Sequence, residues 1–202
     1  RMGNNSIQVL RAFGLSDCSS GNCFTLSGQY ILGNVKRIEI LSNTFTSFTS
    51  FNVFGASKLQ CLTIGSSSFS GNSYSTSEFR IANCSSLRSL TIGSDSFLHY
   101  SSVVVTETTN LRSLSLGNSV FQNVIHMEMK TLGLESITLE NDQFPKLESF
   151  ILSGLNRLMD IHVGKGNGVV ACENGLFSIS NCHVVSSIVI GNGSFRNNTE
   201  MT

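Results

Sequence analysis

The chain has 202 residues, with 13 Lys and Arg against 13 Asp and Glu, so its formal net charge is zero. A neutral chain lacks the basic surface of a nucleic-acid-binding protein, and 40% apolar with only 13% charged residues argues against disorder. No apolar run is long enough for a membrane-spanning helix, so we expect no transmembrane segment in this chain.

The sequence repeats itself every 23–28 residues. Three hexapeptides show the repeat: Ile64-Gly-Ser-Ser-Ser-Phe69, Ile92-Gly-Ser-Asp-Ser-Phe97 and Ile190-Gly-Asn-Gly-Ser-Phe195. Each follows a frame with apolar residues at its first, fourth and sixth places. The frame begins at Leu10, Val35, Leu59, Leu87, Leu111, Leu134, Leu158 and Val185. A fixed period of this length indicates a stacked repeat architecture.

Each unit is expected to contain a strand after the frame start, because its fourth and sixth places alternate as one face of a strand does. Ten places after the start, six units carry a Phe that stacking would align into an internal column: Phe45, Phe69, Phe97, Phe121, Phe144 and Phe195. Two places before that Phe, a small polar side chain is expected to bond the turning backbone: Asn43, Ser67, Asp95, Ser119 and Asp142.

A second apolar pair before the next frame start predicts a second strand on the opposite side of each unit. The pairs are Phe51/Val53, Phe79/Ile81, Val103/Val105, Phe150/Leu152 and Phe177/Ile179, with Met127/Met129 slipped by one place. We therefore predict an all-β solenoid of about eight coils, with two strands per coil and little or no helix. Residues 1–202 form one repeat domain, expected to be a fragment of a longer array.

The frame Leu-x-x-Leu-x-Leu-x-x-Asn-x-Leu resembles that of leucine-rich repeats, as in Val35-x-x-Ile38-x-Ile40-x-x-Asn43-x-Phe45. The Ile-Gly-x-x-Ser-Phe hexapeptides are most similar to the BspA-like surface repeats of bacteria and protists. The resemblance covers residues 10–202 and departs from that family in its second strand and in Ser or Asp at the Asn place. It implies a cell-surface location and carries no catalytic residues to transfer.

The outward places of the first strand carry Ser and Thr beside a short row of charged residues. This surface is either an ordinary soluble strand face or a binding face, because repeat proteins present ligands in this way. The candidate partner-binding residues are Arg88, Arg112, Glu135, Asp160 and His162.

The six cysteines leave their roles open between buried thiols, disulfides and, least favoured, a metal site. Cys18/Cys23 and Cys172/Cys182 each fall within one coil and could pair, whereas Cys84 and Cys182 lie four coils apart. No Cys-x-x-Cys spacing occurs, and no His has a nucleophile and an acid at a matching place. We therefore expect no metal, no cofactor and no enzymatic activity.

The sequence favours a non-enzymatic scaffold that recognises a protein or glycan partner. The alternative is a structural spacer or assembly-forming segment of a larger surface protein. Neither terminal segment offers a polar unit to cap the core, so end-to-end self-association is also expected.

Overall fold

The computed structural model describes residues 6–7, 23–27, 34–70, 77–140, 144–165, 175–191 and 200–201. All regular elements in these ranges are strands, and no helix occurs among them. The strands are β1 (Ser6–Ile7), β2 (Cys23–Ser27), β3 (Arg37–Ile40), β4 (Ser50–Phe54), β5 (Cys61–Ile64), β6 (Glu78–Ala82), β7 (Ser89–Ile92), β8 (Ser102–Thr108), β9 (Ser113–Leu116), β10 (His126–Leu132), β11 (Ser136–Glu140), β12 (Ser149–Ser153), β13 (Asp160–Lys165), β14 (Leu176–Ser180), β15 (Ser187–Ile190) and β16 (Glu200–Met201).

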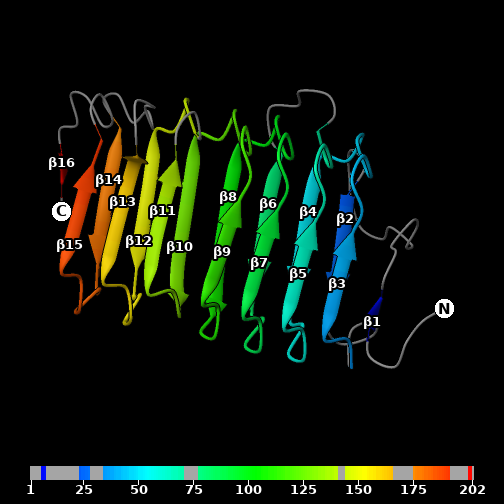
Figure 1. Ribbon diagram of the computed structural model, residues 1–202, viewed down its shortest axis with the longest axis horizontal. Coiled ribbons are helices and arrows are strands. Elements are labelled where there is room, and N and C mark those ends of the chain that lie inside the picture. The colour runs from blue at the N-terminus through cyan, green and yellow to red at the C-terminus, as the bar shows by residue number, and fades with distance from the viewer. Residues whose placement is uncertain are drawn as a thin grey trace.

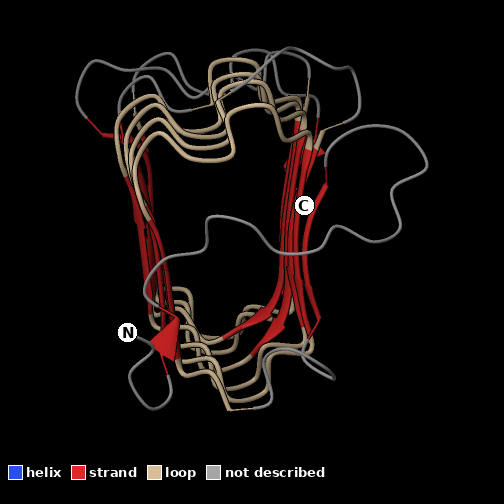
Figure 2. Ribbon diagram, turned by 90° about the vertical axis from the view of Figure 1, so that its right-hand side faces the viewer, coloured by secondary structure: helices blue, strands red, loops and turns tan. Residues whose placement is uncertain are grey.

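The strands form a parallel β-solenoid of about six turns. Odd-numbered strands form the first wall, which consists of a five-stranded sheet, β1-β3-β5-β7-β9, and a three-stranded sheet, β11-β13-β15. Even-numbered strands form the second wall, one eight-stranded sheet from β16 to β2. Figure 1 shows the strands side by side along the long axis, and Figure 2 shows the two walls facing each other. The prediction of an all-β solenoid is confirmed.

Period-two alternation places the core between the two walls. In β5, Leu62 and Ile64 are buried while Cys61 and Thr63 remain partly exposed. In β10, Met127 and Met129 are both buried, and they pair in register with the equivalent valines of β8. The slip in the sequence therefore leaves the second wall intact.

Two columns of phenylalanine rings fill the core at one end of the walls. The predicted column runs through Phe45, Phe69, Phe97, Phe121 and Phe144, with successive ring centroids 4.8–6.0 Å apart. Phe195 lies outside the described residues. A second column, Phe24, Phe51 and Phe79, stacks at 5.0 Å and meets the first edge to face, as between Phe79 and Phe97. Offset stacks and T-shaped pairs are both favoured by the ring quadrupole.

The turn after each first-wall strand explains the repeated hexapeptide. Gly93 packs against the preceding coil, where an added Cβ would lie 2.5 Å from the Ser66 backbone nitrogen. The predicted polar residue and the Phe both adopt positive φ, for example 57° at Asp95 and 56° at Phe97. Ser96 lies between these two residues and makes the side-chain hydrogen bond that was expected of Asp95. The Ser96 Oγ donates to the Gly65 carbonyl oxygen at 3.0 Å.

The hydroxyls at this place form a short ladder between coils. Ser68 and Ser96 are fully buried, and the Ser68 amide donates to Ser96 Oγ at 3.2 Å. The Ser68 hydroxyl in turn donates to the Leu41 carbonyl oxygen at 3.0 Å. The sequence prediction therefore identified the right turn, but in this coil the hydrogen bond is made by buried Ser96, whereas the predicted Asp95 has a positive φ and is exposed. The predicted Asp142 lies outside the described residues.

Candidate functional site

The first wall is interrupted between β9 and β11. The residue that follows a frame start forms a backbone hydrogen bond with its equivalent in the preceding coil. For example, the Arg112 amide donates to the Arg88 carbonyl oxygen at 2.9 Å. The series resumes only where the Met159 amide donates to the Glu135 carbonyl oxygen at 2.8 Å. The second wall continues past this point through the pairing of β8 with β10. The interruption is thus confined to one face of the solenoid.

A shortened corner coincides with this interruption. The step from Leu111 to Leu134 is 23 residues, whereas the steps on either side are 24. This coil is therefore one residue shorter than its neighbours, and the missing residue falls between β10 and β11. Gly133 lies there, directly before the frame start Leu134. Neighbouring coils carry Asn110 and Arg157 at that place, so the corner lacks both a residue and a side chain.

The Arg112 guanidinium crosses the shortened corner. Its Nη1 donates to the carbonyl oxygens of Thr109, at 3.0 Å, and Gly133, at 2.6 Å. A Cβ on residue 133 would overlap both Arg112 Nη1 and the Thr109 oxygen. Glycine is therefore required for Arg112 to reach across, and Arg112 joins two coils whose first-wall strands do not pair.

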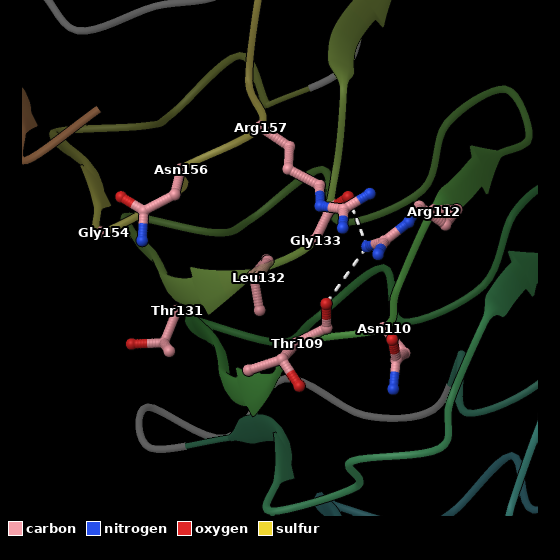
Figure 3. A pocket seen from close by; sticks show the side chains of 9 residues that line it. All are labelled: Thr109, Asn110, Arg112, Thr131, Leu132, Gly133, Gly154, Asn156 and Arg157. Carbon is pink, nitrogen blue, oxygen red and sulfur yellow. Dashed lines mark hydrogen bonds between the residues drawn. The ribbon is translucent and has the colours of Figure 1, made fainter. Parts of the chain in front are cut away.

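A pocket of about 330 Å³ lies beside this bridge. Three successive corners contribute its lining, which consists of Thr109, Asn110, Arg112, Thr131, Leu132, Gly133, Gly154, Asn156 and Arg157. Figure 3 shows the Arg112 and Arg157 side chains approaching each other near Gly133, with Asn156 and Thr131 across the pocket.

The pocket lining carries positive charge and no acidic side chain. Neither Arg112 nor Arg157 forms an ion pair with another described residue, whereas Arg37, Arg80 and Lys130 each pair with a glutamate. Asn110 Nδ2 donates to the Ser85 carbonyl oxygen at 2.7 Å, and this bond does not use the acceptor Oδ1. The site therefore offers guanidinium donors together with amide and hydroxyl groups.

Backbone strain also occurs at the pocket. Thr131 has a φ of 55°, and the equivalent places of neighbouring coils carry Gly154 at 66° and Glu107 at 53°. A β-branched residue in the left-handed region is unusual and costs about 1–3 kcal/mol. Thr131, which has this strained backbone conformation, also lines the pocket.

The structure divides the predicted binding residues between two groups. Arg88 and Arg112 lie on adjacent coils before the interruption, while Glu135, Asp160 and His162 lie after it. Asp160 and His162 occupy alternate places of β13 and share its outward face. Arg112 belongs to the pocket and has a structural role, which the sequence did not indicate.

Sequence reasoning missed Arg157, Asn110, Asn156 and Thr131 as members of a site. Asn110, Asn156 and Arg157 lie between strands and Thr131 lies near the end of β10, all outside the frame used for prediction. The available signal was the one-place slip at Met127/Met129 together with the short step to Leu134.

The cysteines have different roles. Cys23 is disulfide-bonded, and Cys18 and Cys172 lie outside the described residues. Cys182 is a free thiol, so the Cys172/Cys182 pairing is not formed. Cys84 is free and fully buried, and burial raises its pKa. Cys61 is also free.

Among the described residues, no group of three or more His, Cys, Asp or Glu side chains could hold a metal ion. The same part of the chain contains no helix long and apolar enough to cross a membrane. No family model, curated protein or solved structure matches this chain. The leucine-rich-repeat resemblance therefore stays a prediction.

Proposed function

We propose that this chain is a non-enzymatic scaffold that recognises a protein or glycan partner through the outward face of its first wall. The proposal includes a leucine-rich-repeat architecture of eight coils with two strands each, and display at the cell surface. The alternation of odd and even strands between two walls supports the architecture. The cell-surface location is supported by the sequence resemblance alone.

The observation that carries the proposal is the unpaired charge on this face. Within the described ranges, all three ion pairs are formed by other residues: Arg37–Glu39, Arg80–Glu78 and Lys130–Glu128. Arg88 and Glu135 are exposed, Asp160 is partly exposed, and none of the three belongs to these pairs. Unpaired charges of both signs on a regular surface provide complementarity and specificity for a partner. Exposed Ser113, Ser115 and Thr138 add hydrogen-bonding groups beside them.

The test compares two triple variants of equal net charge change. The face variant carries Arg88→Gln, Glu135→Gln and Asp160→Asn. The control variant carries Arg80→Gln, Glu78→Gln and Glu128→Gln on the second wall. Arg112 is left unchanged because it bridges the interrupted corner and its loss would destabilise the fold.

Both variants and the unaltered chain are used in affinity capture, followed by direct binding measurements on each captured partner. Loss of a partner from the face variant alone, with an unchanged melting temperature, supports recognition through this face. Identical captured partners from all three proteins would reject it and favour the alternative, a structural spacer or assembly-forming segment. End-to-end self-association belongs to that alternative.

A further inference from the structure

We infer that the pocket at the interrupted corner binds a carboxylate-bearing sugar residue of an acidic glycan. Its residues were not part of the predicted face, apart from Arg112. The inference rests on the proposed function in one respect, since it names the ligand class for a site beside the same wall.

The two arginines supply the anion-binding part of the site. A guanidinium is planar, permanently charged, and forms paired hydrogen bonds with a carboxylate. Arg112 uses Nη1 for the corner bonds to Thr109 and Gly133, which leaves its other N–H groups for a ligand. Arg157 is exposed and has no hydrogen bond or ion pair with another described residue. Glu107 and Glu135, the acidic residues nearest in sequence, do not line the pocket.

The remaining lining favours a sugar over a simple anion. Asn110 and Asn156 provide carboxamide groups on the corners that flank Gly133, and Thr109 and Thr131 provide hydroxyls. Carboxamides and hydroxyls both donate and accept hydrogen bonds, as vicinal sugar hydroxyls require. An inorganic anion accepts hydrogen bonds only, so it would leave the carboxamide oxygens of the lining unused.

The size of the pocket limits what it can hold. A volume of about 330 Å³ is at the small end of ligand-binding pockets and accommodates one sugar ring with its carboxylate. Most of its polar side chains are exposed, so a glycan chain can enter and leave the site on the solvent side. Because the whole chain has zero net charge, this local positive charge is not a consequence of a basic protein.

Calorimetric titration of the 202-residue chain with trigalacturonate tests the inference. Maltotriose serves as the neutral saccharide, sodium sulfate as the simple anion, and hexaglutamate as the acidic peptide. We expect trigalacturonate to bind most tightly of the four. Arg157→Gln removes a charged ligand group without removing any bond described within the protein, and should weaken trigalacturonate binding about tenfold or more.

Two further variants separate this site from general charge effects. Asn156→Ala should weaken trigalacturonate binding several-fold, because it removes a carboxamide across the pocket from the arginines. Arg80→Gln carries the same charge change on the second wall and should leave binding within about twofold. Far-ultraviolet circular dichroism of each variant confirms that the fold is retained.

The inference is overturned if trigalacturonate does not bind, if Arg157→Gln binds it normally, or if maltotriose or sulfate binds equally well. Tighter binding of hexaglutamate would assign the pocket to an acidic protein segment instead. The triple face variant distinguishes the two proposals, because it leaves the pocket lining unchanged. If the face variant still binds trigalacturonate and captures the same partners as the unaltered chain, only the face proposal is rejected. If the unaltered chain does not bind trigalacturonate but the face variant loses a partner, only the pocket proposal is rejected.

Discussion

Replacing Phe97 with alanine should strongly destabilise the solenoid, because this ring lies at the middle of the first phenylalanine column and also contacts two rings of the second. The side chain is fully buried. Its ring centroid lies 4.8–5.6 Å from five other aromatic rings: Phe51, Phe69, Phe79, Tyr100 and Phe121. Neighbours fixed in stacks on both sides cannot close the resulting cavity. We therefore expect a loss of about 3–5 kcal/mol in the free energy of unfolding, toward the upper end of that range.

Urea unfolding followed by circular dichroism measures this loss, provided that the slope of the transition is unchanged. Phe54→Ala is the matched control, since Phe54 lies in a strand but is 52% exposed, and it should cost about 1 kcal/mol or less. A loss below about 1 kcal/mol for Phe97→Ala would show that the ring is not buried and that the repeat register is wrong.

Three further changes test other contacts. Gly93→Ala should cost about 1–3 kcal/mol, because its Cβ would press on the Ser66 backbone, while exposed Ser113→Ala should be neutral in the same denaturation assay. Thr108→Val should stabilise the chain by about 1–2 kcal/mol, since the buried Thr108 hydroxyl has no hydrogen-bond partner among the described residues; a lower melting temperature would contradict this. Burial raises the pKa of Tyr100, whose hydroxyl donates to the Phe48 carbonyl oxygen at 3.2 Å. The folded chain therefore keeps this proton longer than the unfolded chain, and stability should fall as the pH rises above about 10, by about 1.4 kcal/mol per unit. Tyr100→Phe should be less stable than the unaltered chain at neutral pH but more stable near pH 11, and parallel pH profiles would refute the assignment.

The sequence alone was enough to locate the strands and the first phenylalanine column. Alternating pairs such as Leu90 and Ile92 report which side chains face inward, because a strand turns its side chains to opposite faces at every residue. The regular return of Phe69 and Phe97 then predicts stacking, since equivalent places of a parallel solenoid lie above one another. These inferences need only local periodicity and the repeat length.

The tertiary structure alone determined what happens where coils meet irregularly. The sequence placed Arg112 on a binding face, but its guanidinium bridges a corner that is one residue short, and Arg157 joins it from the next corner. Likewise, the hydrogen bond to the preceding turn is made by Ser96 and not by Asp95, which has a positive φ and an exposed side chain. Such contacts depend on the offset between neighbouring coils, which arises from long-range packing and not from the period of the sequence.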